Sequence, residues 1–263
     1  MLEARDLRKS FAREAEGFSS SAHRFQAVDG VSLSVGHGET LGIVGESGCG
    51  KTTLARMLTR LIEPDSGEIQ FMGRDWLGAS GGKLRAMRRR MQMVFQDPVA
   101  SLNPRMRVGT IIGEPIAIHE PRTSLLARRK EVLEALEAVG LAPAAFDRYP
   151  HEFSGGQRQR IGIARALILR PELIVADEPV SALDVSVGAQ ILELLAKLRR
   201  EFSLTLILIS HSLPVVAQLA DRIAVMQSGR IVETGSCGSM LGNPQHEYTK
   251  SLLAAVPEIP SQV

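Results

Sequence analysis

Residues 45–52 of this 263-residue chain fit the phosphate-loop pattern G-x-x-x-x-G-K-[ST] at every fixed position. Glycines let such a loop curl so that successive backbone N–H groups point inward at phosphate oxygens. Lys51 would then reach the β- and γ-phosphates of a nucleoside triphosphate, and the Thr52 hydroxyl would ligate Mg²⁺. The residues expected to bind the nucleotide here are Gly45, Glu46, Ser47, Gly48, Cys49, Gly50, Lys51, Thr52 and Thr53. The alternative is a glycine-rich turn without a ligand.

The segments on either side of the loop favour the phosphate-binding interpretation. Residues 41–44 are a short apolar run that is typical of a buried strand, and residues 53–58 have helical composition. A strand, a glycine loop and a helix are the context that the motif needs, and the helix adds its positive N-terminal end. Cys49 lies inside the loop, where we interpret it as a small residue that fits rather than as a nucleophile.

Two acidic residues, Asp177 and Glu178, directly follow the apolar run 173–176. An acid at the carboxyl end of a buried strand beside a phosphate loop can hold Mg²⁺, directly or through water, which is the role predicted for Asp177. Glu178 points differently and would polarise the attacking water as a general base.

Two further features are weaker signals when each is taken alone. Ser154 is a good N-cap for the helical run that follows, and Gly155 and Gly156 leave the first N–H groups bare. This arrangement makes either a second anion site or only a helix cap, and the residues leave both readings open. His211 follows the apolar run 204–209, where its imidazole would contact the γ-phosphate, although a lone histidine is usually structural.

The elements that must position these residues predict an α/β fold. The apolar runs 173–176 and 204–209 alternate with helical patterns, which indicates a mostly parallel sheet. Strands at 31–35 and 68–71 suggest a small antiparallel sheet. A helix with Val132, Leu133, Leu136 and Val139 on one face is expected over 124–139, inside a helical insert. Residues 223–233 complete the pattern as a hairpin.

The bulk composition excludes several classes of protein. The 31 Lys+Arg and 29 Asp+Glu residues give a net charge of +2, which provides no electrostatic case for binding nucleic acid or a membrane surface. The basic run 83–90 is interpreted as a solvated helix face, with a nucleic-acid contact as the alternative.

The two cysteines suggest a reducing compartment. The charged N-terminus and the lack of a long apolar run predict a soluble, cytoplasmic protein that reaches a membrane only through a partner.

In order along the chain, these features resemble the nucleotide-binding subunit of an ABC transporter. The phosphate loop is followed by Gln96, the signature Ser154-Gly155-Gly156-Gln157, Asp177-Glu178, the D-loop 181–184 and His211. The resemblance implies an ABC-type P-loop NTPase with a RecA-like core, a small antiparallel β subdomain and an inserted α-helical subdomain. Residues 1–263 would form one nucleotide-binding domain, with the core at 1–96 and 166–240, the helical signature subdomain at 97–165 and a short tail at 241–263.

The same resemblance assigns roles within the predicted site. The catalytic residues would be Lys51, Gln96, Glu178 and His211, and the Mg²⁺ ligands Thr52, Gln96 and Asp177. Ser154 and Gly156 of the signature would contact the γ-phosphate of ATP bound on a second subunit. Gly155, Gln157 and Asp184 are also expected among the nucleotide-binding residues. Phe11 stands where the family carries an aromatic residue that stacks on adenine, with Phe18 in reserve.

Finer detail looks like the peptide/nickel importer branch of that family, and most like the second ATPase subunit of dipeptide and oligopeptide importers. The segments that carry this likeness are 95–98, 101–105, 151–160, 176–186 and 246–253. One departure is Ser212, which stands where the branch usually has an acid and which is still expected to cap the following helix.

The likeness implies an ATP-hydrolysing subunit that powers peptide import at the cytoplasmic face of the inner membrane. Its expected partners are a second ABC ATPase subunit, identical or paralogous, membrane-embedded permease subunits and, indirectly, a solute-binding protein, but no nucleic acid. Import of nickel or another small solute, a soluble non-transport ABC ATPase and a purely regulatory nucleotide-binding module are the alternatives.

Overall fold

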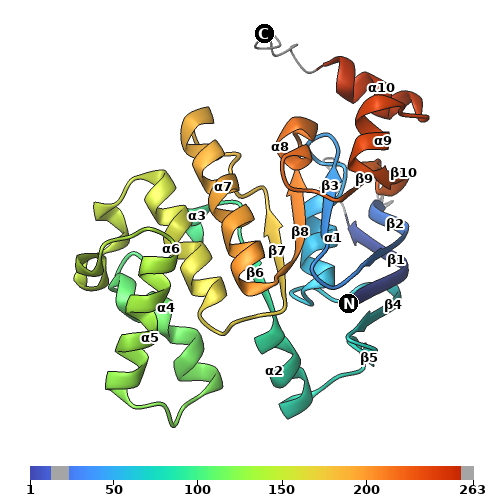
Figure 1. Ribbon diagram of the computed structural model, residues 1–263. Helices are drawn as coiled ribbons and strands as arrows, with labels where there is room; N and C mark the ends of the chain where they lie inside the picture. The colour runs from blue at the N-terminus through green and yellow to red at the C-terminus, as the bar shows by residue number, and fades with distance from the viewer. Residues whose placement is uncertain (13–23, 256–263) are drawn as a thin grey trace, which may run out of the picture. The chain divides into compact units, whose positions relative to one another are not determined.

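The computed structural model describes residues 1–12 and 24–255 (Figure 1). The chain divides into two compact units. Unit 1 comprises Met1–Val35, Thr40–Leu77 and Leu208–Val263, and unit 2 comprises Gly36–Glu39 and Gly78–Ile207. Within the described residues, no helix is both long and apolar enough to cross a membrane.

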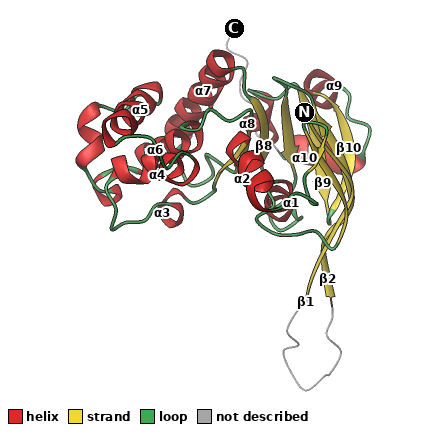
Figure 2. Ribbon diagram, turned by 90° about the horizontal axis from the view of Figure 1, so that it is seen from below, coloured by secondary structure: helices red, strands yellow, loops and turns green. Residues whose placement is uncertain are grey.

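Unit 1 contains a four-stranded antiparallel sheet with the order β2-β1-β4-β5. The strands are β1 (Leu2–Ala12), β2 (Arg24–Val35), β4 (Ser66–Phe71) and β5 (Arg74–Asp75). Apolar residues of β1 such as Leu2, Ala4 and Leu7 are buried, while the other residues of the strand are half-buried or exposed. Figure 2 shows β1 and β2 running side by side. The small antiparallel sheet that the sequence predicts is confirmed.

The second sheet carries the phosphate loop. In unit 1 its strand order is β10-β9-β3-β8. The strands are β3 (Thr40–Val44), β8 (Thr205–Ser210), β9 (Arg222–Gln227) and β10 (Arg230–Ser236). The helices of this unit are α1 (Lys51–Leu58), α8 (Leu213–Ala217), α9 (Cys237–Gly242) and α10 (Glu247–Ala254). All five residues of β3 are buried, and β3 pairs parallel with β9. The predicted hairpin is formed by β9 and β10, which pair antiparallel.

Trp76, the only tryptophan of the sequence, packs between helix α1 and strand β4 of the antiparallel sheet. Its side chain is fully buried, and its indole Nε1–H donates a 2.8 Å hydrogen bond to the carbonyl oxygen of Leu58 at the end of α1. Its ring meets Phe71 of β4 edge-on, with 5.8 Å between ring centroids. This geometry satisfies the indole donor and adds the preferred aromatic contact.

We expect the Trp76→Ala variant to be destabilised by about 3–5 kcal/mol, because truncating a buried aromatic leaves a cavity and removes the indole hydrogen bond. Urea unfolding followed by far-UV circular dichroism measures this change, since the variant has no tryptophan fluorescence. Leu241→Ala, at a residue that is 42% exposed, is the control and should change stability by roughly 0.5 kcal/mol or less. Equal midpoints for the two variants would contradict the assigned role.

Unit 2 combines β6, β7 and the first three residues of β8, 205–207, with most of the described helices, and the sheet order there is β8-β7-β6. The strands β6 (Met91–Val94) and β7 (Leu173–Asp177) pair parallel. The helices are α2 (Gly81–Arg90), α3 (Pro98–Ser101), α4 (Val108–His119), α5 (Leu125–Ala138), α6 (Gly155–Leu167) and α7 (Val185–Phe202), with 3-10 turns η1 (Pro143–Asp147) and η2 (Pro150–Glu152). Figure 2 shows α4, α5 and α6 packed together.

Helix α5 forms where the sequence predicts it. The Ser124 hydroxyl accepts a 3.2 Å hydrogen bond from the Ala127 N–H and so caps the first turn. Val132, Leu136 and Val139 are buried as expected, but Leu133 is only half-buried. The assignment of Leu133 to the packed face was therefore wrong. The buried face of the helix is narrower than the spacing of its apolar residues suggests, and Leu133 lies at the edge of that face.

The basic run lies on helix α2 and pairs with acidic residues of the same unit. Arg89 forms an ion pair with Glu120, and Arg90 forms one with Glu172. These side chains are between 30% and 46% exposed. The pairs are consistent with the interpretation of this run as a solvated helix face.

Candidate nucleotide site

The phosphate loop connects buried strand β3 to helix α1 in unit 1. Gly50 is the N-cap of α1 and has φ of 108°, a conformation that side-chain-bearing residues rarely adopt. A Cβ atom on Gly50 would lie 2.1 Å from the carbonyl oxygen of Ala27, and one on Gly45 would lie 2.1 Å from that of Met226. The surrounding backbone therefore holds the loop so closely that only glycine fits at these two positions.

Lys51 is folded over this loop, with its side chain 4% exposed. Its ammonium donates hydrogen bonds to the carbonyl oxygens of Gly45, at 2.7 Å, and Glu46, at 2.8 Å. The Sγ atom of Cys49 lies 3.8 Å from the same nitrogen. The cation is thus held against the loop by the loop's own carbonyl groups.

Cys49 behaves as the sequence suggested, as a small buried side chain. Burial raises the pKa of the Cys49 thiol, and the neighbouring Lys51 opposes this shift only in part. A raised pKa leaves the group as a thiol at neutral pH, and it is the thiolate that reacts. The interpretation of Cys49 as a fitting residue rather than a nucleophile is supported.

Tyr248 of α10 is a contact of the loop that the sequence analysis missed. Its Oη atom accepts a 3.0 Å hydrogen bond from the backbone N–H of Glu46. The two residues are 202 positions apart, and no pattern in the chain relates them. In the sequence, residues 246–253 indicate only a resemblance to the peptide/nickel importer branch, and not a contact with the loop.

His211 follows β8, which is the neighbour of β3 in the strand order. The phosphate loop likewise follows β3, so both segments leave the ends of adjacent strands in unit 1.

The expectation that the Ser212 side chain caps the following helix was wrong. Ser212 occupies the N-cap position of α8, yet its side chain makes no capping hydrogen bond, and its N–H instead donates to the Ser210 hydroxyl at 3.0 Å.

In unit 2, the predicted acidic residues and the predicted glutamine meet at the ends of two paired strands. Val94 of β6 is in register with Ala176 of β7, so Gln96 and Glu178 both lie two residues beyond a paired position. The Gln96 Nε2 atom donates a 3.2 Å hydrogen bond to the Glu178 Oε2 atom. The structure thus brings these two residues together across 82 positions of sequence.

Glu178 has an unusual backbone conformation. Its φ is 45°, in the left-handed region, which costs a non-glycine residue about 1–3 kcal/mol and is found preferentially at functional sites. The carbonyl oxygen of Glu178 accepts hydrogen bonds from the Ser181 N–H, at 3.2 Å, and the Ser181 hydroxyl, at 3.1 Å. The D-loop therefore holds the turn that sets the direction of the Glu178 side chain.

The predicted magnesium ligands have a donor chemistry that fits the ion. Asp177 is 2% exposed at the end of β7, and Thr52 lies in the first turn of α1. Gln96 contacts Glu178 through its amide nitrogen, and its amide oxygen is the donor type that Mg²⁺ binds. A carboxylate, a hydroxyl and an amide oxygen are hard ligands of the kind that Mg²⁺ prefers. The assignment of these three residues stays a prediction.

The signature segment opens helix α6 as a capping box. The Ser154 hydroxyl accepts a hydrogen bond from the Gln157 N–H at 3.3 Å, and the Gln157 side chain accepts one from the Ser154 N–H at 3.0 Å. A Cβ atom on Gly155 would lie 3.2 Å from the Leu183 side chain, and one on Gly156 would lie 2.4 Å from that of Val187. The glycines therefore let this helix end approach the D-loop and α7, and Ser154 remains exposed.

Two other predicted residues lie on exposed positions. Asp184 is the N-cap of α7 without a side-chain capping bond. Phe11, on β1, is 43% exposed and lies opposite Phe25 of β2, which is 50% exposed. An exposed aromatic face is what stacking on a base requires. Phe18 lies outside the described residues.

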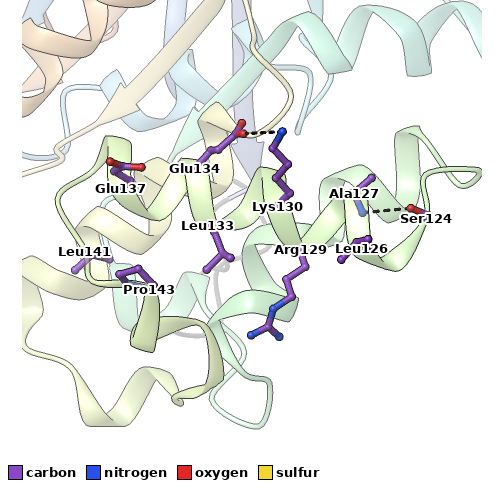
Figure 3. A pocket seen from close by; sticks show the side chains of 10 residues that line it. All are labelled: Ser124, Leu126, Ala127, Arg129, Lys130, Leu133, Glu134, Glu137, Leu141 and Pro143. Carbon is purple, nitrogen blue, oxygen red and sulfur yellow. Dashed lines mark hydrogen bonds and ion pairs between the residues drawn. The ribbon is translucent and has the colours of Figure 1, made fainter.

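A large hollow, about 920 Å³ in volume, lies on α5 in unit 2 and contains none of the predicted site residues (Figure 3). Leu126, Leu133 and Leu141 line it, and Lys130 and Glu134 form a 3.8 Å ion pair beside them. The hollow therefore accounts for the exposed side of Leu133.

Residues 28–181 match the family model described as "ABC transporter". The chain belongs to this family. It is 52% identical to the oligopeptide transport ATP-binding protein AppF of Bacillus subtilis, over 98% of this chain and 78% of that protein. It is 50% identical to the oligopeptide transport ATP-binding protein OppF of Salmonella typhimurium, and 48% identical to the dipeptide transport ATP-binding protein DppF of Haemophilus influenzae. Both alignments cover 98% of this chain, and they cover 78% of OppF and 79% of DppF.

Solved structures of ABC cassettes share the fold. A dimeric, post-hydrolysis state of the ATP-binding cassette MJ0796, bound to ADP and Pi, matches with a TM-score of 0.79 and 29% identity, over 90% of this chain and 99% of that one. CbiO1 of Clostridium perfringens matches with a TM-score of 0.77 and 26% identity, over 92% of this chain and 90% of that one. The family and the ABC-type α/β fold class that the sequence predicted are both confirmed.

Proposed function

We propose that this ABC protein is an ATP-hydrolysing subunit that powers the import of dipeptides or oligopeptides. Relatives of about 50% identity over nearly the whole chain are named for oligopeptide and dipeptide transport, which supports the substrate class. The chain retains Lys51, Asp177, Glu178 and His211, so each group that the reaction needs is present. Retention of all four disfavours a purely regulatory nucleotide-binding module.

The placement of Glu178 is the observation that carries the hydrolytic function. A carboxylate at the end of a buried strand, in a left-handed backbone conformation and hydrogen bonded to Gln96, is oriented by its surroundings. A carboxylate held in this way acts as a general base, withdrawing a proton from the attacking water. Gln96 and the D-loop hydroxyl of Ser181 position it.

The remaining residues bind and orient ATP. Lys51 exchanges its loop carbonyl contacts for phosphate oxygens, the N–H groups of residues 45–53 surround the phosphates, and Phe11 stacks on the base. His211 contacts the γ-phosphate. Mg²⁺, held by Thr52, Asp177 and Gln96, would neutralise charge on the phosphates.

The signature segment and the D-loop serve a second subunit. Ser154 and Asp184 are exposed, and Gly156 lies in the first turn of α6. The bare N–H groups at the start of this helix favour an anion. We place the γ-phosphate of the partner's ATP there, and a dimeric cassette among the structural neighbours supports this arrangement. Residues 97–165 would then be the helical signature subdomain, residues 1–96 and 166–240 the core and residues 241–263 the tail.

The partners proposed for transport are permease subunits in the inner membrane, contacted from the cytoplasmic face, and a solute-binding protein that delivers the peptide.

The complex of all subunits, reconstituted in liposomes, tests the proposal. We expect phosphate release to rise when the solute-binding protein carries a di- or oligopeptide, and labelled peptide to accumulate only with ATP. Stimulation by nickel ions and not by peptides would overturn the substrate class, and ATP hydrolysis without any permease association would overturn the transport role.

A further inference from the structure

Helix α10 contacts the phosphate loop through the buried hydroxyl group of Tyr248. Tyr248 is 8% exposed, and its Oη atom lies 3.0 Å from the backbone nitrogen of Glu46. Burial raises the pKa of Tyr248, so the phenol is neutral across the physiological range. A neutral phenol oxygen accepts the Glu46 N–H as an ordinary hydrogen bond.

The other side of the Glu46 residue faces the catalytic lysine. Its carbonyl oxygen accepts hydrogen bonds from the Lys51 ammonium, at 2.8 Å, and from the Cys49 N–H, at 3.3 Å. Tyr248 therefore holds a residue whose carbonyl group in turn holds Lys51. A displacement of Glu46 changes both the curl of the loop and the position of the cation.

The start of α10 is itself fixed in place. The His246 Nδ1 atom accepts a 3.2 Å hydrogen bond from the Tyr248 N–H and caps the helix. The Glu233 carboxylate of β10 accepts the N–H groups of Gln245, at 2.7 Å, and His246, at 3.1 Å. A chain of hydrogen bonds thus runs from β10 through the helix cap to the phosphate loop, all within unit 1.

We propose that Tyr248 is a positioning residue for the phosphate loop, and that helix α10 tunes the affinity of that loop for ATP. The side chain acts through Glu46 and does not touch the nucleotide. The inference rests on the proposed function, because it takes ATP as the ligand of the loop.

The Tyr248→Phe variant tests this role, since it removes the hydroxyl and keeps the buried ring. Loss of one neutral hydrogen bond to the loop should raise the dissociation constant for ATP about 2- to 10-fold. The turnover rate at saturating ATP should change by less than the affinity does, because the side chains of Glu178, Gln96 and Lys51 are all retained. Equilibrium binding of a fluorescent ATP analogue and steady-state phosphate release, both on the full chain, measure the two quantities.

Cys49 provides a second readout that does not depend on catalysis. If the Glu46 residue moves when the hydroxyl is removed, the Cys49 thiol becomes more accessible, and its alkylation without nucleotide should be faster in Tyr248→Phe. Ser251→Ala is a matched control, because it removes a hydroxyl from the same helix, and this hydroxyl donates to the carbonyl oxygens of Glu247 and Tyr248 rather than to the phosphate loop. Its affinity for ATP and its alkylation rate should equal those of the unmodified chain.

A second pair of variants covers the case in which Tyr248→Phe folds poorly. His246→Ala removes the helix cap and should weaken ATP binding in the same direction, whereas His246→Asn keeps a good capping acceptor and should restore it. Unchanged ATP affinity in folded Tyr248→Phe, or equal affinity for both His246 variants and the unmodified chain, would overturn the inference. If the unmodified chain itself fails to bind ATP, the proposed function fails instead, so the two failures are distinguishable.

Discussion

Replacing Glu178 with glutamine is expected to reduce ATP turnover by about 10²- to 10⁴-fold while leaving ATP binding intact. Glutamine has nearly the same shape as glutamate, and its amide oxygen can still accept the hydrogen bond from Gln96. What the substitution removes is the ability to take a proton from water. A large loss of turnover with unchanged affinity is therefore the signature of a general base.

Phosphate release and equilibrium ATP binding, measured on the same preparation, separate these effects. Glu193→Gln is the matched control, because Glu193 is an exposed residue of α7 and the same chemical change there should leave both quantities unchanged. Turnover of Glu178→Gln within a few-fold of the unmodified chain would refute the assignment of Glu178. Loss of binding together with turnover would instead indicate that Glu178 supports the shape of the site.

Replacing Lys51 with alanine is expected to weaken ATP binding about 10- to 150-fold, since a hydrogen bond to a charged group contributes about 1.5–3 kcal/mol. Turnover should fall further, by roughly 10³-fold, because the lysine also stabilises the charge of the transferring phosphoryl group. Isothermal titration with ATP and a phosphate-release assay give the two numbers. The combined loss distinguishes Lys51 from Glu178, whose substitution should affect turnover alone.

Lys51 also bonds to the carbonyl oxygens of Gly45 and Glu46, so the variant must be shown to fold. The thermal unfolding midpoint without nucleotide checks this point. Lys197→Ala is the matched control, because Lys197 lies on the exposed side of α7 in a 3.7 Å pair with Glu201. ATP affinity of a folded Lys51→Ala chain equal to that of this control would contradict a phosphate-binding role for Lys51.

Local signals in the sequence predicted much of the fold. The helix at 124–139 was found because Ser124 and Gly140 mark its ends and apolar residues recur at helical spacing. The buried strands β3, β7 and β8 were found because uninterrupted apolar runs are typical of strands covered on both faces. These properties are encoded within a few neighbouring residues, so they need no knowledge of the rest of the chain.

Failures of the sequence analysis occurred where a choice between contacts decides the outcome. Ser212 has the right type for a helix cap, but its side chain makes no capping bond and its N–H bonds to the Ser210 hydroxyl. Leu133 has the right spacing for the core, but three other residues fill that face and it lies in the hollow of α5. Residue type and spacing describe what a side chain can do, and packing selects one of the possibilities.

The sequence by itself determined the chemistry of this protein: the phosphate loop, the acidic pair and the signature, in an order that identifies an ABC cassette. Only the tertiary structure decided how these groups are held. It paired Gln96 with Glu178, folded Lys51 onto the carbonyl groups of its own loop and placed Tyr248 against Glu46. A motif is a local property of the chain, whereas a hydrogen bond between residues 82 or 202 positions apart depends on every element that packs between them.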